Sequence, residues 1–233
     1  MLPSLTIIDD FLTDPWAARR AALMLDYARP GAGGNYPGRD STTALPMDGI
    51  NETVSRRLGV DLIGATGTEH GHCRLTLKAD KGRSGVHIDP AFYSGILYLS
   101  RPEDCARPGA GGTDFFRHKR TGLERVPTNG AELAATGYDD LDTLISDVVN
   151  KDTTQPARWE RVMRVPMRFN RLVLFSPWQF HNAAPGFGTD AESARLVMLL
   201  EPGTVTSAVT GPVIGIISIK SGNGITSPPF RPA

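Results

Sequence analysis

The chain has 233 residues, 25 basic and 25 acidic side chains, and two cysteines, Cys73 and Cys105. A formal net charge of zero gives no positive field to attract nucleic acid, and two scattered cysteines do not make a disulfide framework. With 40% hydrophobic and 21% charged residues, the composition is that of one large globular domain, for which a small-molecule substrate is expected.

The N-terminal residues 1–72 are predicted to form a helical support. Leu5–Ile8 is a short strand, and Thr13 or Asp14 can cap a helix that begins at Pro15 and runs to about Ala28. The chain does not open with a basic segment followed by a long apolar stretch, and no run approaches the length of a membrane span. We therefore expect a cytoplasmic protein without an export signal or a membrane segment.

A surface loop and a second helix complete this support. Residues 29–46 are rich in Gly and Pro, which predicts a loop over the domain. The helix is predicted over Ile50–Leu58, and Gly59 can take the left-handed conformation that stops it.

Residues 73–201 show a different pattern, with short apolar runs typical of strands. The predicted strands are Cys73–Lys78, Gly95–Ser100, Thr113–Arg117, Arg158–Phe169, Arg171–Phe175 and Arg195–Glu201. Between them, residues 121–155 form a helical insertion, because apolar side chains recur there at helical spacing. Residues 202–233 are a C-terminal extension, in which 213–219 is either one more strand or an arm exchanged with a second copy in a homodimer.

Three side chains are candidate metal ligands and catalytic residues: His87, Asp89 and His181. On an extended segment His87 and Asp89 point to the same side, while Ile88 points away. Two imidazoles and one carboxylate suit Fe(II), and they leave positions open for dioxygen and a chelating co-substrate. The alternative for His87 and Asp89 is an ordinary hydrogen bond in a loop.

The sequence around these residues resembles the Fe(II)/2-oxoglutarate-dependent dioxygenase superfamily, particularly its prolyl-hydroxylase-like branch. The resemblance covers about 73–201, and the opening Ile7-Ile-Asp-Asp-Phe-Leu is also similar. Its motifs are His87-Ile-Asp89 before a Tyr-Leu strand, Gly111-Gly112 before Thr113, a Leu-Phe strand ending at Phe175, the distal His181, and the downstream Arg195.

The resemblance implies a mainly β fold with flanking helices around a double-stranded β-helix, the cupin-like jelly roll. His87, Asp89 and His181 would ligate Fe(II), and Arg195 would bind the distal carboxylate of 2-oxoglutarate. The implied reaction oxidises a small-molecule or amino-acid-like substrate with dioxygen and converts 2-oxoglutarate to succinate and CO2. A carboxylate at position 89 favours hydroxylation, desaturation or cyclisation, since halogenating relatives carry Gly or Ala there.

Two departures from the family pattern concern spacing. The step from Asp89 to His181 is long, which the insertion at 121–155 would explain. Arg195 lies farther beyond His181 than is common. A buried guanidinium is nevertheless costly without an anion, and its planar fork suits a carboxylate. The alternative is an Arg195 at the surface, paired with Asp190 or Glu192.

Four other side chains on or beside the predicted strands are candidates for holding 2-oxoglutarate, each with a structural role as its alternative: Arg74, Thr76, Tyr93 and Tyr98. His70 and His72 form a loop-like His-x-His pair. His118, among basic neighbours, is expected to be exposed. The loops at 29–46 and 121–155 are candidates for a substrate lid.

Two other classes of function stay open. One is a cupin-like metal enzyme that does not use 2-oxoglutarate, which an Arg195 facing solvent would favour. The other is a non-catalytic jelly-roll binding module, which a failure to bind metal would favour.

Overall fold

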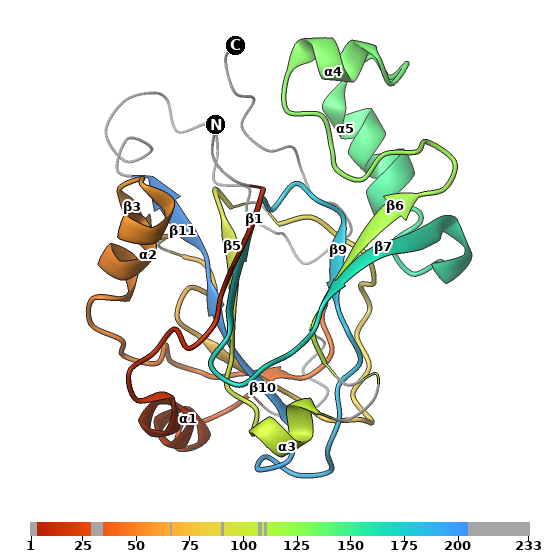
Figure 1. Cartoon of the computed structure of the whole chain (residues 1–233). Coiled ribbons are helices and arrows are strands. Elements are labelled where there is room, and N and C mark those ends of the chain that lie inside the picture. The colour runs from red at the N-terminus through yellow and green to blue at the C-terminus, as the bar shows by residue number, and fades with distance from the viewer. Residues whose placement is uncertain are drawn as a thin grey trace.

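The protein is mainly β, with helices at the sides of the sheets, as the sequence predicted (Figure 1). The structure is a computed structural model, and it describes residues 4–28, 35–65, 67–89, 91–106, 109 and 111–204. The apolar stretch 213–219 lies outside the described residues. No helix in the described part of the chain has the length and apolar character needed to cross a membrane.

The larger sheet has six antiparallel strands in the order β1-β8-β5-β10-β4-β2. They are β1 (Leu5–Ile8), β8 (Leu172–Phe175), β5 (Ser94–Tyr98), β10 (Arg195–Leu200), β4 (Cys73–Thr76) and β2 (Arg39–Asp40). All four residues of β8 are buried, because both faces of this strand are covered. The prediction of β1 is confirmed to the residue, whereas the two-residue β2 was not predicted.

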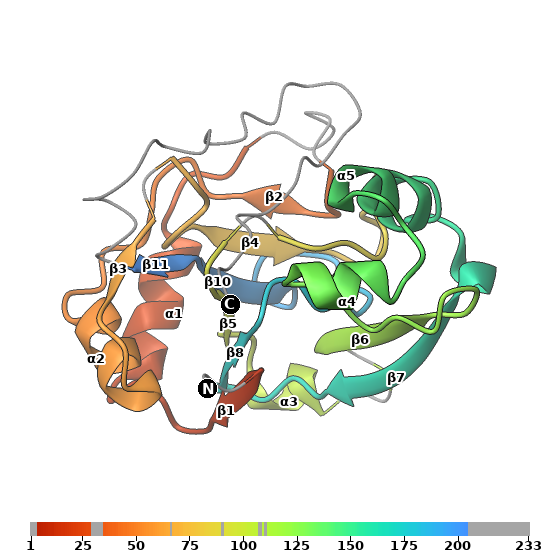
Figure 2. The ribbon, with the colours of Figure 1, turned by 90° about the horizontal axis from the view of Figure 1, so that it is seen from above.

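The smaller sheet has three antiparallel strands in the order β7-β6-β9. They are β7 (Trp159–Val165), β6 (Thr113–His118) and β9 (His181–Ala183), and an isolated bridge pairs His87 with His181 at the free edge of β9. The two sheets lie on opposite sides of the molecule (Figure 2). Apolar side chains fill the space between them, and Phe115 of β6 meets Phe175 of β8 edge to face at 5.3 Å.

From β4 to β10 the chain changes sheet at every step except between β6 and β7, which are neighbours in the smaller sheet. The larger sheet takes β4, β5, β8 and β10, and the smaller sheet takes the His87 bridge, β6, β7 and β9. The chain therefore crosses repeatedly from one sheet to the other, and residues from distant parts of the sequence meet between them.

Two helices cover the outer face of the larger sheet. In α1 (Pro15–Leu23) the Asp14 carboxylate accepts a hydrogen bond from the Ala17 N–H at 2.8 Å, which is an N-cap. Extending this helix to Ala28 was wrong, because Ala28 donates its N–H to the Asp40 carbonyl instead. The prediction of α2 (Ile50–Leu58) is confirmed, and Gly59 ends it with a φ of 68°.

Several short helices lie between β6 and β7: α4 (Gly130–Ala134), α5 (Leu141–Leu144), the π-helix η1 (Ile145–Asn150) and the 3-10 helix η2 (Pro156–Arg158). Asn129 and Asp140 are the N-caps of α4 and α5, so this segment forms several short helices instead of one long helix. Their apolar side chains pack on Trp178 and Phe180, which are core residues. The remaining elements are α3 (Pro102–Cys105) and the two-stranded sheet of β3 (Leu62–Gly64) with β11 (Pro202–Thr204).

His118 is fully buried, which corrects the expectation that it is exposed. Its Nε2 lies 2.9 Å from Asp152 Oδ2, its Nδ1 lies 3.0 Å from Thr121 Oγ1, and its ring contacts Trp159. The expectation of exposure rested on the basic neighbours of His118 in the sequence. It was wrong because Asp152, from the segment between β6 and β7, provides an acidic partner for the buried ring.

The His118→Ala variant should therefore unfold more easily than the parent protein. Removing the imidazole leaves the buried Asp152 carboxylate without its nearest partner, which should lower the free energy of unfolding by about 2–4 kcal/mol. Urea unfolding followed by fluorescence measures the change. The exposed neighbour supplies a control: Lys119→Ala should change stability by no more than about 0.5 kcal/mol. Equal effects of the two substitutions would contradict a structural role for the His118–Asp152 pair.

Candidate metal centre

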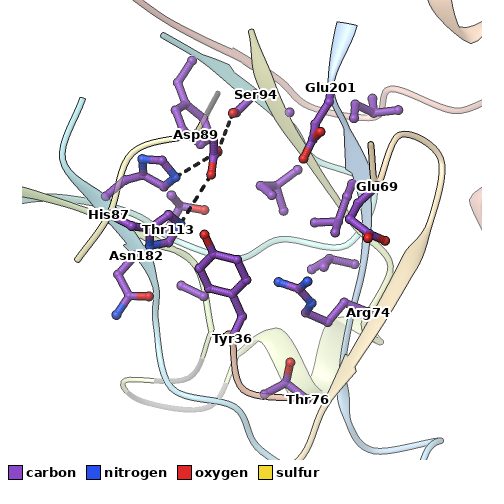
Figure 3. A pocket seen from close by; sticks show the side chains of 18 of the residues that line it. Tyr36, Glu69, Arg74, Thr76, His87, Asp89, Ser94, Thr113, Asn182 and Glu201 are labelled. Carbon is purple, nitrogen blue, oxygen red and sulfur yellow. Dashed lines mark hydrogen bonds and ion pairs between the residues drawn. The ribbon is translucent and has the colours of Figure 1, made fainter. Parts of the chain in front are cut away.

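His87, Asp89 and His181 meet between the two sheets. One ligand atom from each lies within 4.8 Å of the others: His87 Nε2 is 3.6 Å from Asp89 Oδ1, and His181 Nε2 is 3.2 Å from Asp89 Oδ2 (Figure 3). Two backbone hydrogen bonds of 3.0 Å, exchanged between His87 and His181, hold the two segments together. Ile88 packs on the opposite side, in the core.

Both imidazoles are oriented by the backbone in the same way. His87 Nδ1 lies 2.8 Å from the Gly85 carbonyl oxygen, and His181 Nδ1 lies 2.8 Å from the Gln179 carbonyl oxygen. A carbonyl can only accept, so each Nδ1 carries a proton, and each ring turns its Nε2 toward Asp89. Metal-binding histidines are oriented by outer hydrogen bonds of this kind.

The charges of His87 and Asp89 suit metal binding at neutral pH. Burial, reinforced by the neighbouring His181, lowers the pKa of His87 to about 4, so its ring is neutral. Burial alone would raise the pKa of Asp89, but His181 and His87 together hold it below its ordinary value. The Ser94 hydroxyl adds to this by donating a hydrogen bond to Asp89 Oδ2 at 2.6 Å.

A cavity of about 110 Å³ opens beside the three residues. Its walls come from both sheets and from the segment before β2. Besides the three candidate ligands and Arg195, the lining residues with polar side chains are Tyr36, Glu69, Arg74, Thr76, Ser94, Thr113, Asn182 and Glu201 (Figure 3). Pockets for drug-sized ligands span about 300–1,000 Å³, so this cavity fits a small acid.

Arg195 is buried, with 3% of its surface exposed, and it lines this cavity. Its Nη2 donates a long hydrogen bond of 3.4 Å to the Gly112 carbonyl, while its Nε has no hydrogen-bond partner among the described residues. Burial lowers the pKa of this guanidinium, and the described residues include no carboxylate paired with it. The surface alternative, in which Arg195 pairs with Asp190 or Glu192, is therefore wrong. Glu192 pairs with Arg19 instead.

The four other candidates for holding 2-oxoglutarate are placed differently from one another. Thr76 and Arg74 line the cavity, but Arg74 is bound at both ends of its fork by Asp40, at 2.5 and 2.8 Å. Tyr98 is fully buried and shares a hydrogen bond of 2.8 Å with Thr113, which lines the cavity. Tyr93 packs in the hydrophobic core and is not among the described lining residues.

Tyr36 and Glu201 are among the lining residues that were not candidates from the sequence. The Tyr36 ring lies over the Arg74 guanidinium at 5.1 Å and against the His87 ring at 4.5 Å. Tyr36 lies in the predicted surface loop, where no periodicity indicates where a side chain points. Glu201 lies at the end of the strand that Arg195 begins, so strand alternation from Arg195 could have identified it.

His70 and His72 do not approach the three residues. His70 Nδ1 accepts a hydrogen bond of 3.0 Å from the Glu201 N–H, and His72 Nδ1 lies 2.7 Å from the Ser41 carbonyl. Neither belongs to the group of possible metal ligands found in the described part of the chain.

Solved structures with similar folds are Fe/2-oxoglutarate-dependent oxygenases. The non-heme alpha-ketoglutarate-dependent carbocyclase SnoK from nogalamycin biosynthesis has a TM-score of 0.50 at 14% identity, over 86% of this chain and 79% of that one. HygX from Streptomyces hygroscopicus, solved with nickel, 2-oxoglutarate and hygromycin B, has a TM-score of 0.47 at 14% identity, over 87% and 83% of the two chains. A prolyl hydroxylase from Trichoplax adhaerens has a TM-score of 0.45 at 13% identity, over 86% and 83%.

At these low identities the comparison shows a similar fold and nothing more. This conclusion rests on SnoK, whose TM-score is 0.50. The chain belongs to the family of unknown function DUF6445, whose model matches residues 3–197. No curated protein matches the sequence.

Proposed function

We propose that this protein is an Fe(II)- and 2-oxoglutarate-dependent oxygenase, built as a single domain on a double-stranded β-helix. The alternation of strands between two antiparallel sheets supports this architecture, with β4, β10, β5 and β8 in one sheet and the His87 bridge, β9, β6 and β7 in the other. In this proposal residues 73–201 are the jelly-roll core, 121–155 an insertion, 1–72 a support and 202–233 an extension.

His87, Asp89 and His181 would hold the iron. The observation that carries the proposal is the convergence of two Nε2 atoms on one carboxylate, since these three groups lie within 4.8 Å of one another and could hold a shared cation. Two imidazoles and one carboxylate are the ligand set of non-haem Fe(II) oxygenases. When bound, Fe(II) and 2-oxoglutarate would activate dioxygen for oxidation of a C–H bond, with release of succinate and CO2.

Arg195 would bind the distal carboxylate of 2-oxoglutarate. A buried guanidinium with a free Nε–H is costly until an anion reaches it, and a carboxylate can accept two parallel hydrogen bonds from its fork. Thr76, which pairs with Arg195 across β4 and β10, is the second candidate for the same carboxylate. Arg74 is occupied by Asp40, and Tyr98 acts through Thr113.

The residues of the chain also prepare the site for a second substrate. Ser94 orients Asp89 through a hydrogen bond, and two backbone carbonyls orient the imidazoles. Apolar side chains such as Phe175 and Val197 form part of the cavity wall. A small molecule or an amino-acid-like compound would then be hydroxylated, desaturated or cyclised. The buried Arg195 favours this proposal over a cupin-like enzyme without 2-oxoglutarate.

An anaerobic titration tests the proposal. Metal-free protein receives Fe(II) and then 2-oxoglutarate, and a visible charge-transfer band from the chelated keto acid is the expected result. Succinate is the matched control, because it lacks the keto oxygen and should give no band. Iron binding without a band would favour the cupin-like alternative, and failure to bind iron would refute the oxygenase and favour a binding module.

A further inference from the structure

Opposite charges lie at the start of β10 and just after its end. Arg195, Val197 and Leu199 alternate along β10 and line the cavity, while Leu196 and Met198 pack on the other face; Leu200 and Glu201, the residue after the strand, also line the cavity. Arg195 and Glu201 are six residues apart, which is roughly 20 Å along a strand. The cavity therefore has a cationic end at Arg195 and an anionic end at Glu201.

The backbone of Glu201 is fixed on both sides. Its N–H donates to His70 Nδ1 at 3.0 Å, and its carbonyl accepts from the Ala65 N–H at 3.0 Å. Pro202 then pairs with Gly64 in the β11–β3 sheet. The backbone of Glu201 is therefore fixed, and its side chain points into the cavity on the side that faces Asp89 (Figure 3).

Glu201 lacks a cationic partner within the described part of the chain, where no Lys, Arg or His lies within ion-pair distance of its carboxylate. Arg74, which lines the same cavity, is occupied by Asp40. Burial and then the charge of Asp89 raise the pKa of Glu201 to about 7, while the Thr68 hydroxyl offsets this only in part. The carboxylate thus stands in a site that favours an incoming cation.

The charges of the loaded site lead to the same conclusion. Fe(II) with the Asp89 carboxylate has one net positive charge, and dianionic 2-oxoglutarate with Arg195 has one net negative charge, so these cancel. Arg74 and Asp40 cancel as well. The Glu201 carboxylate is left uncompensated, with Glu69 nearer the surface. The ionised Glu201 is neutralised either by taking up a proton or by a bound molecule that brings a positive charge.

We propose that Glu201 determines substrate specificity by binding a cationic nitrogen, so that the substrate is a small molecule with an amino group. The inference rests on the oxygenase function proposed above. An ammonium group held by Glu201 would lie at the end of the cavity away from Arg195, and it would not compete with 2-oxoglutarate. A charge-assisted hydrogen bond in a partly buried site favours the amine over a neutral analogue of the same shape.

The test uses protein loaded anaerobically with Fe(II) and 2-oxoglutarate, and a series of primary alkylamines with their N-acetyl derivatives as probes. Calorimetry measures binding, and the visible band reports that the site is loaded. The amines should bind the parent protein about tenfold or more tightly than the neutral derivatives. In Glu201→Gln this preference should disappear while the band still forms. Glu52→Gln, which removes an exposed carboxylate from α2, should keep the preference.

Each remaining outcome overturns the inference. Equal binding of amines and acetylated derivatives, no binding of any amine, or a preference that survives in Glu201→Gln would each refute it while leaving the oxygenase proposal intact, provided that the band forms. Absence of the band in the parent protein would refute the oxygenase proposal, and this inference would fall with it.

Discussion

Replacing His181 by alanine should weaken Fe(II) binding by more than about 100-fold and abolish turnover of 2-oxoglutarate. Loss of even an outer hydrogen-bond partner of a metal ligand costs about 10–100-fold in affinity, and His181 would be a ligand itself. The remaining His87 and Asp89 come from one short segment, so the metal would lose its link to β9. Anaerobic titration with Fe(II), followed by metal analysis of the dialysed protein, measures the effect.

His72→Ala is the control, because His72 is a partly exposed histidine that, like His181, has a backbone carbonyl partner but does not line the cavity. It should retain iron binding within a fewfold of the parent. A His181→Ala protein that still binds iron as tightly as the parent would exclude the proposed ligand set, whatever its activity. Circular dichroism of both variants separates loss of the ligand from loss of the fold.

Much of the sheet structure could be predicted from the sequence, because long strands carry a periodic signal. β8 and β10 are continuous apolar runs, and they were predicted to within a residue or two of their ends. β2 and β9 have two and three residues, too few for any periodicity to show. They form because a neighbouring strand offers a free edge, which is a property of the assembled sheet and not of the segment.

The predicted site residues divide in the same way. His87, Asp89 and His181 carry a motif and a resemblance, and their convergence between the sheets agrees with that prediction. Tyr36 and Glu201 carry neither. Tyr36 reaches the cavity through a loop whose course depends on contacts with Arg74 and His87. The position of Glu201 depends on the hydrogen bonds that its backbone donates to His70 Nδ1 and accepts from the Ala65 N–H. The contacts of Tyr36 leave no local pattern in the sequence, whereas Glu201 could have been found only by extending the strand alternation from Arg195.

Replacing Arg195 by methionine should raise the concentration of 2-oxoglutarate needed to form the visible band by about 100-fold or more. Two charge-assisted hydrogen bonds between a guanidinium fork and a carboxylate are removed, and each contributes about 1.5–3 kcal/mol. Iron binding should be nearly unchanged, because the three ligand residues do not depend on Arg195 for their hydrogen bonds. Arg195→Lys, which keeps the charge but loses the planar fork, should lie between the parent and Arg195→Met.

The same substitution should have the opposite effect on the stability of the unliganded protein. In the absence of 2-oxoglutarate, Arg195 is a buried cation with an unpartnered Nε and no described carboxylate partner, whereas methionine is apolar and of similar length. Replacing buried charges by apolar side chains of similar volume stabilises proteins by about 1–4 kcal/mol where packing is kept. Arg195→Met should therefore unfold at a higher urea concentration than the parent without 2-oxoglutarate, and this advantage should shrink when the keto acid and a metal are added. A variant that is destabilised under both conditions would contradict this stability prediction and show that Arg195 supports the fold.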